Sequence, residues 1–275
     1  DVPAYNWSRN DYGGEGDPGV RKIAYPGGYE TILKGTRTCY LCPVSCRREV
    51  SVEDETYSTG GLVEGPEYET MSILGPNCGI DDIKVIAKIN DLCNLYGIDT
   101  ISAGATIAFA MECYERGIIG KEDTDGLELK FGNAEAAIEL IHKIAKREGF
   151  GNILAEGVRR AATIIGKGAE NYALHVKGQE ISAHDPRAAQ AQAVVYATSI
   201  TGARHNEGFT LFLELGAWQT SELPYPKVKD PSSTEGKGML AKIQQDWRAY
   251  YNVAGFCGFA DLGGIYVKES DYVKI

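Results

Sequence analysis

The clearest hydrophobic periodicity lies in the first half of the chain. Between Asp81 and Tyr96, apolar residues recur at steps of three and four, and charged residues fall mostly between them. This spacing predicts an amphipathic helix that ends before Gly97, since glycine commonly terminates helices. Asp99 follows as a suitable N-cap of a second helix, which the pattern extends to Arg116.

Weaker periodicity predicts further helices, separated by long irregular connections. They are expected at residues 133–147, 152–165, 186–200 and 239–254. Residues 171–182 alternate only weakly and indicate a short strand or an extended loop. The chain is therefore expected to be mainly α-helical.

The same pattern divides the chain into three parts. Residues 1–30 are rich in Gly, Pro, Asp and Tyr, and we expect them to wrap another part of the protein as an extended lead-in segment. Residues 31–170 are predicted to form one helical domain, and residues 171–275 a second, truncated one. Within these domains, the polar stretches at 48–63 and 220–238 indicate surface loops.

The chain of 275 residues is acidic, with 28 Lys and Arg residues, 38 Asp and Glu residues and a formal net charge of −10. It lacks the basic balance of a general nucleic-acid binder and is not drawn to anionic membranes. No apolar run approaches the roughly 18 to 20 residues of a spanning helix, and no signal peptide is visible. We therefore expect a cytoplasmic protein. The sequence starts without Met, which suggests a processed or excerpted chain.

Three of the seven cysteines lie within eight residues, with the spacing Cys39-x2-Cys42-x3-Cys46. Three thiolates this close can hold three corners of a [4Fe–4S] cluster, whose fourth ligand must come from elsewhere. Zinc is the alternative, because a C-x2-C pair also suits a tetrahedral zinc site. Zinc sites usually have a second paired spacing, and the other cysteines and the four histidines of this chain stand alone. The spacing therefore favours the cluster without excluding zinc.

Three arginines, Arg37, Arg47 and Arg48, flank this cysteine group. Their positive charge would favour the reduced, more anionic form of a cluster and raise its potential. The alternative interpretation is that these side chains are simply solvated.

A second segment of interest runs from Glu64 to Thr70 and places three carboxylates around a Gly-Pro turn. Pro66 can open a helix, which would put Glu67 and Glu69 in its first turn, where the helix dipole favours negative charge. A purely structural role would explain these acids. A carboxylate beside a tyrosine could also serve as a base with an adjacent hydrogen-bond donor.

Five segments, taken together and in order, resemble the tungsten-containing aldehyde ferredoxin oxidoreductase family. They are Cys39/Cys42/Cys46, Glu64–Thr70, Tyr96–Ser102, Asp185–Arg187 with Tyr196–Ser199, and Gly255–Cys257. The resemblance covers nearly the whole chain. It implies the two multihelical domains 2 and 3 of that architecture, without the family's N-terminal β domain, so we expect the chain to be part of a larger enzyme whose other domains complete the site.

The resemblance also implies cofactors, reaction and partners. Family members bind tungsten, or sometimes molybdenum, through the dithiolenes of two pterins, with a [4Fe–4S] cluster close by. The usual reaction oxidises an aldehyde to a carboxylic acid and passes electrons to ferredoxin or a partner subunit.

The resemblance suggests roles for individual residues. The four residues that match the cluster ligands are Cys39, Cys42, Cys46 and Cys257. Glu69 matches a glutamate that would activate water or relay a proton, and Tyr68 matches a donor to the substrate carbonyl or a metal-bound oxygen. His205 matches a histidine that hydrogen-bonds the oxo group or the substrate.

The family's pterin-binding motif, D-x-x-G-L-(D/C), has two counterparts here. The matching residues are Asn94, Gly97, Ile98 and Asp99 in the first copy, and Asn252, Gly255, Phe256 and Cys257 in the second. Both leading aspartates are asparagines, which can accept a hydrogen bond without charge assistance. We expect pterin binding with weaker or altered contacts. An iron–sulfur electron-transfer module without pterin is an alternative.

Some relatives carry an E-x-x-H metal site on the helix before the first copy. The matching positions here are Lys88 and Asp91, so that site is expected to be absent. An E-x-x-H does occur at Glu139 and His142, which we interpret as a solvated helix face.

Cys78 supports a separate hypothesis. Tungsten subunits of class II benzoyl-CoA reductase, a branch of the same family, use a cysteine thiolate as a metal ligand, and Cys78 follows Glu69 closely enough to be considered for that role. The alternative is a small buried cysteine. Cys93 and Cys113 fall in predicted helices and are expected in the core.

Overall fold

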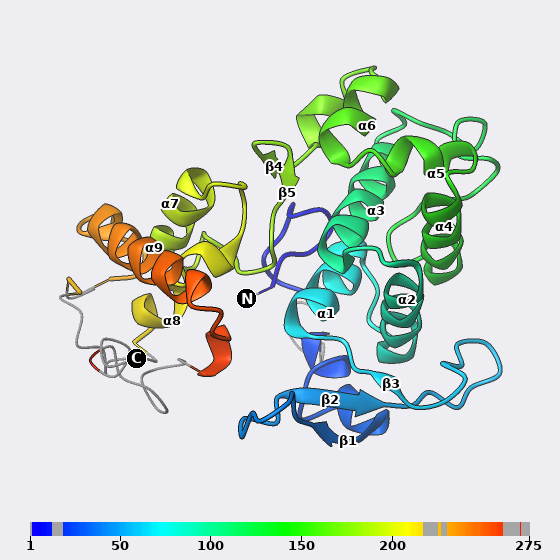
Figure 1. Ribbon diagram of the computed structural model, residues 1–275. Coiled ribbons are helices and arrows are strands. Elements are labelled where there is room, and N and C mark those ends of the chain that lie inside the picture. Colours follow the sequence, from blue (N-terminus) through cyan, green and yellow to red (C-terminus); the bar gives the residue numbers. More distant parts are fainter. Residues whose placement is uncertain (1, 13–18, 217–224, 227–229, 261–269, 271–275) are drawn as a thin grey trace. The chain divides into compact units, whose positions relative to one another are not determined.

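The computed structural model describes residues 2–12, 19–216, 225–226, 230–260 and 270 (Figure 1). The chain divides into two compact units, Asp1–Ala183 and His184–Ile275. No helix of the described residues is long and apolar enough to cross a membrane.

The first unit contains a small antiparallel sheet that the sequence pattern did not predict. Its strands are β1 (Leu33–Arg37), β2 (Arg47–Val50) and β3 (Val63–Glu64), paired in the order β1-β2-β3. The cysteine loop is the connection between β1 and β2. Residues 48–63, expected as a surface loop, therefore include most of β2 and the start of β3.

The rest of the first unit is helical. Its α-helices are α1 (Tyr68–Leu74), α2 (Ile83–Tyr96), α3 (Thr100–Glu115), α4 (Ala134–Lys146), α5 (Gly149–Leu154) and α6 (Val158–Ile165). Its 3-10 turns are η1 (Gly19–Lys22), η2 (Gly28–Thr31), η3 (Pro76–Cys78) and η4 (Ala169–Tyr172). Helix α3 packs against α1, while α2 lies beside α4 (Figure 1). A Cβ on Gly104 would come within 2.7 Å of the Ile73 side chain, so glycine permits the close approach of α1 and α3.

Local capping explains where these helices start. The carboxylate of Asp82 accepts a hydrogen bond from Lys84 N at 2.9 Å, and that of Asp99 accepts one from Ser102 N at 2.8 Å. Asn133 caps α4 in the same way. The helices expected from residue 81, residue 99 and residue 133 are therefore confirmed.

The single helix expected over 152–165 is wrong. The chain forms α5 and α6 instead, with a break between them. The physical reason lies 22 residues further on, where the Glu180 carboxylate accepts a 2.8 Å hydrogen bond from Val158 N and so caps a new helix start. A partner this distant in sequence leaves no local signal.

The lead-in segment packs on the helical part of its own unit. Tyr5 N donates to Pro76 O at 3.1 Å, and Asn6 Nδ2 donates to the buried Glu112 carboxylate at 2.6 Å. Residues 1 and 13–18 of this segment lie outside the described residues.

A short hairpin, β4 (His175–Val176) and β5 (Gln179–Glu180), ends the first unit. It fits the strand or loop expected over residues 171–182. Gln179 Nε2 donates a hydrogen bond to Ser102 Oγ of α3 at 3.2 Å.

The second unit contains α7 (Gln190–Thr198), η5 (His205–Glu207), α8 (Leu211–Glu214), α9 (Lys237–Val253) and η6 (Gly258–Ala260). Helix α7 starts four residues after Pro186, because Asp185 and Arg187 form a tight turn in which Arg187 N donates to Asp185 Oδ1 at 2.9 Å. The helix expected at 239–254 is confirmed as α9. Residues 220–224 and 227–229 of the expected loop lie outside the described residues.

Candidate active site and cofactor residues

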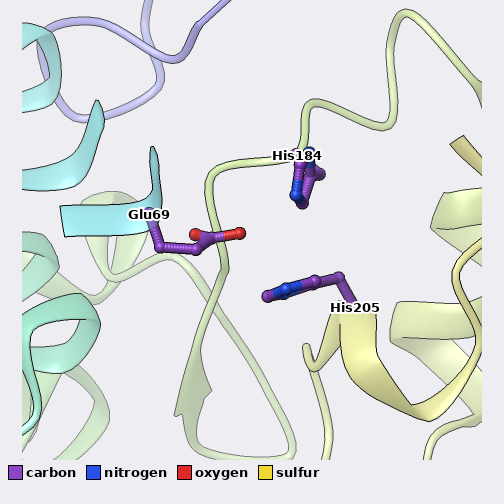
Figure 2. A group of neighbouring side chains, drawn as sticks. All are labelled: Glu69, His184 and His205. Atoms are coloured by element: carbon purple, nitrogen blue, oxygen red, sulfur yellow. The ribbon is translucent and has the colours of Figure 1, made fainter. Parts of the chain in front are cut away.

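Glu69 lies in the first turn of α1, and Figure 2 shows its side chain extending from that helix. Its Oε2 accepts a 2.5 Å hydrogen bond from the main-chain N–H of Ala183. Burial raises the pKa of Glu69 to about 7, the charge of Asp99 adds to the rise, and the Ala183 N–H opposes it. This carboxyl group can therefore hold or release a proton near neutral pH.

Tyr68 contacts the same peptide segment. Its hydroxyl donates to the carbonyl oxygen of Ala183 at 3.4 Å. Ala183 is fully buried and clusters with Ile73 and Ala105. Two adjacent side chains are thus anchored to one buried residue, which fixes their direction at the start of α1. We expected α1 to include Glu67 in its first turn, and Glu67 is instead the residue before the helix.

His205 lies on η5 of the second unit, where its ring contacts that of His184 (Figure 2). The two ring centroids are 4.8 Å apart, and Phe209 packs against both rings at 5.0 and 5.6 Å. Burial lowers the pKa of His184 to about 4 and that of His205 to about 3, and charges on His184, Arg248 and Arg204 lower the His205 value further. Both imidazoles are therefore neutral at pH 7.

His184 was missed by sequence reasoning. It directly precedes the Asp185-Pro-Arg187 turn, and its carbonyl oxygen accepts a 2.9 Å hydrogen bond from the Tyr196 hydroxyl. The signal available in the sequence was its adjacency to that motif. Only the fold brings its ring to His205.

The cysteine loop presents a set of soft donors. Cys39 is exposed and Cys42 and Cys46 are half-buried, all within the β1–β2 connection, and Cys42 N donates to Cys39 O at 3.0 Å. Cys257 is exposed and follows α9 in the second unit. Accessible thiol sulfurs on one short loop fit an iron–sulfur cluster, and they equally fit zinc.

Each of the three flanking arginines is paired with a carboxylate. Arg37 pairs with Glu49, Arg47 with Glu64, and Arg48 with Glu67. The sequence left two interpretations of these arginines, a positive charge acting on the cluster or simple solvation. The ion pairs show that their charge is compensated and that they are not simply solvated.

The two pterin-motif copies have the same local geometry although they lie in different units. Each begins in the last turn of a long helix and continues past its end. The main-chain oxygen of its asparagine accepts a hydrogen bond from the glycine N–H, at 3.3 Å for Asn94 and Gly97 and 3.1 Å for Asn252 and Gly255. Both glycines have positive φ and no neighbouring atom within 4 Å of a built Cβ. This exposed, unobstructed backbone fits the approach of a pterin.

The remaining residues of these copies lie in the same turns. Asp99 caps α3, and the second copy includes Phe256. Ile98 N donates to Cys93 O at 2.8 Å, which closes the first turn.

Cys78 lies in the core of the first unit. Its side chain is fully buried, and its Sγ donates to the main-chain oxygens of Ile73 and Gly104, each at 3.4 Å. Burial strongly raises the pKa of this thiol, which disfavours the thiolate that a metal ligand requires. The structure therefore favours the buried-cysteine interpretation over metal ligation. Cys93 and Cys113 are buried as expected.

The interpretation of His142 as part of a solvated helix face is incomplete. It shares a 2.8 Å hydrogen bond, through Nδ1, with the hydroxyl of Tyr96. Tyr96 belongs to the first pterin-motif copy, so α4 supports that turn.

The whole chain matches a family model. Residues 1–275 fit the model described as aldehyde ferredoxin oxidoreductase, domains 2 & 3. The chain is similar to tungsten-containing aldehyde ferredoxin oxidoreductases of Pyrococcus horikoshii (40% identity over 253 residues) and Thermococcus kodakarensis (36% over 251 residues), with 89% of this chain and 39% of each relative covered. It also resembles the WOR-like subunit of an aliphatic sulfonate oxidoreductase of Pyrococcus furiosus, at 38% identity over 240 residues, 85% of this chain and 34% of the relative.

A solved structure agrees with these similarities. The BamBC active-site complex of benzoyl-coenzyme A reductase with 1,5-dienoyl-CoA matches with a TM-score of 0.56 and 27% identity, covering 77% of this chain and 32% of that chain. The chain spans about 39% of the length of the curated aldehyde ferredoxin oxidoreductases it matches. On the match of all its residues to the family model, this chain belongs to the aldehyde ferredoxin oxidoreductase family and corresponds to the helical domains 2 and 3.

Proposed function

We propose that this chain contributes the helical part of a tungsten bis-pterin enzyme that oxidises an aldehyde to a carboxylic acid. In that reaction an aldehyde and one water give an acid, two protons and two electrons. The observation that carries the proposal is Glu69, a buried carboxyl with a pKa near 7, set in a chain whose relatives are named tungsten-containing aldehyde ferredoxin oxidoreductases.

Glu69 would take the proton released when water adds to the aldehyde carbon. Its raised pKa suits this task, because a base works best when its pKa lies near the working pH. The Ala183 N–H holds Oε2 of Glu69, and Oε1 would accept the proton. Tyr68, anchored beside it, would donate its hydroxyl proton to the substrate carbonyl oxygen.

His205 and His184 would supply neutral imidazoles to the same reaction. A neutral imidazole can donate through one nitrogen and accept through the other, so it can bind a carbonyl oxygen without adding charge. Phe209 packs against both rings and so restricts their orientation.

The cofactors would be held by residues already described. The turns at Asn94–Asp99 and Asn252–Cys257 would bind the pterins, and Cys39, Cys42, Cys46 and Cys257 would bind a [4Fe–4S] cluster. When bound, tungsten or molybdenum supplies two-electron redox chemistry and the cluster supplies single-electron transfer. Ferredoxin or an electron-transfer subunit would then accept the electrons, and further domains of the enzyme would complete the site.

A second candidate is the tungsten subunit of a benzoyl-CoA reductase-like enzyme, which would reduce an aromatic thioester. The match to the benzoyl-coenzyme A reductase complex favours it. The burial of Cys78 counts against the sequence feature that favours it.

A substrate panel separates the two candidates. The enzyme is assayed anaerobically with short-chain and aromatic aldehydes and a one-electron dye, and with a dienoyl-CoA thioester and the same dye. Dye reduction that depends on aldehyde, with acid formed in step, supports the proposal. Turnover of the thioester alone would replace it with the reductase.

A further inference from the structure

A square of four charged residues lies at the base of the cysteine loop. In the sheet, Arg37 of β1 stands opposite Arg47 of β2, and Glu49 of β2 stands opposite Glu64 of β3. Like charges directly opposite each other would repel. The ion pairs instead run diagonally, from Arg37 to Glu49 and from Arg47 to Glu64.

Cross-strand partners and alternate residues along a strand share one face of a sheet. Arg47 and Glu49 therefore share a face with Arg37 and Glu64, and the square carries two positive and two negative charges. Arg48 lies on the opposite face, where its guanidinium stacks on Tyr29 at 5.3 Å.

Arg47 is the member of the square nearest to the cysteines. It directly follows Cys46 in the chain, and its guanidinium interacts electrostatically with the Cys39 side chain. The same guanidinium makes a two-pronged contact with Glu64, in which Nε donates to Oε1 at 2.8 Å and Nη2 donates to Oε2. The two-pronged contact fixes the plane of the guanidinium, so Glu64 determines the orientation of the Arg47 side chain next to the cysteine loop.

Glu64 also connects the square to the proposed active site. Its main-chain oxygen accepts a 3.0 Å hydrogen bond from Asn90 Nδ2 of α2, and its chain continues through Gly65 and Pro66 into Tyr68 and Glu69. The residue that orients Arg47, Glu64, thus begins the chain segment that carries the proposed base, Glu69.

We propose that Arg47 tunes the reduction potential of the cluster bound by this loop through its positive charge beside Cys39 and Cys46, and that Glu64 positions Arg47 and offsets its charge. This inference rests on the proposed [4Fe–4S] cluster. Charge near a cluster helps to set its potential. Removing Arg47 takes away a positive charge and leaves Glu64 uncompensated, whereas removing the Glu64 charge leaves Arg47 uncompensated.

The test is an EPR-monitored redox titration of the holoenzyme and its variants. Arg47→Gln should shift the midpoint potential of the cluster downward, and Glu64→Gln should shift it upward. Arg48→Gln removes the same charge from the opposite face and is the matched control, with a smaller shift expected. Opposite signs for the two variants are not produced by a general loosening of the loop.

Two outcomes would overturn the inference in a protein that holds its cluster. One is a shift of the same sign, or no shift, in both Arg47→Gln and Glu64→Gln. The other is an Arg48→Gln shift as large as that of Arg47→Gln. Iron and sulfide are measured in every sample to show that the cluster is present. If Arg47→Gln loses its cluster, Glu64→Gln still tests the inference because it retains the arginine. A wild-type protein without iron would reject the cluster itself and the proposed function with it. The iron analysis therefore distinguishes this failure from a failure of the Arg47 inference alone.

Discussion

The main-chain N–H of Ala183 donates a 2.5 Å hydrogen bond to Oε2 of Glu69, which lies 114 residues earlier in the chain. This bond ties the end of the first unit to the first turn of α1. It stabilises the ionised carboxylate, and burial acts in the opposite direction. Because burial is the larger influence, Glu69 stays protonated at mildly acidic pH.

Replacing this carboxyl should abolish most turnover. We expect Glu69→Gln to lower kcat by roughly 10²- to 10⁴-fold, the usual contribution of a general base, and to remove the limb of the pH–rate profile near pH 7. Glu67→Gln is the matched control, because Glu67 pairs with Arg48 and its side chain is 51% exposed. Equal losses in both variants, or an unchanged limb in Glu69→Gln, would contradict the role of Glu69.

The same carboxyl makes stability depend on pH. Its pKa is raised from 4.5 to about 7 on folding, so between these values the folded chain binds more protons than the unfolded chain. The free energy of unfolding should therefore fall as pH rises through this window, by at most about 3 kcal/mol for the Glu69 contribution. Denaturant titrations at several pH values, compared between wild type and Glu69→Gln, isolate this contribution, and parallel curves would count against it.

The histidine pair should act in the opposite direction. The pKa of His184 falls from 6.5 to about 4 on folding, so the unfolded chain binds more protons within that window. Stability should be lost as pH falls from about 7 to about 4, by about 3 kcal/mol for His184. His184→Gln should flatten this acid limb, and NMR titration of the imidazole signals should show neutral rings at pH 6. A protonated ring at pH 6 would refute the prediction.

Restoring the aspartates of the pterin turns should strengthen pterin retention. Asn94→Asp and Asn252→Asp each add a charge-assisted hydrogen bond, which is roughly twice as strong as a neutral one. We expect a several-fold higher pterin content after extended gel filtration, measured by fluorescence of the oxidised pterin. Asn152→Asp adds the same charge at an exposed position that belongs to neither turn, and it should leave the content unchanged.

Sequence patterns predicted the features of the fold that depend on neighbouring residues. Asp99 and Asn133 cap their helices through bonds to residues three positions ahead, so their effect is visible in a short window. The break before α6 depends on Glu180, and the small sheet depends on pairing between residues 33 and 64, which a short window does not contain.

The candidate site divides in the same way. Tyr68, Glu69 and His205 were identified through their motifs, but the raised pKa of Glu69 comes from burial that only the fold creates. His184 has no periodic or spacing signal, and its ring meets His205 only in the folded second unit. The pairing of Arg47 with Glu64 likewise required the strand register.

The proposed function requires that this chain help to hold a tungsten bis-pterin and a [4Fe–4S] cluster. Both are checked by quantitative metal and sulfide analysis of the anaerobically purified enzyme. We expect one tungsten, or molybdenum, together with about four irons and four sulfides per chain. Iron without tungsten or molybdenum would instead indicate an electron-transfer module, and zinc alone at the cysteine loop would refute the proposed function.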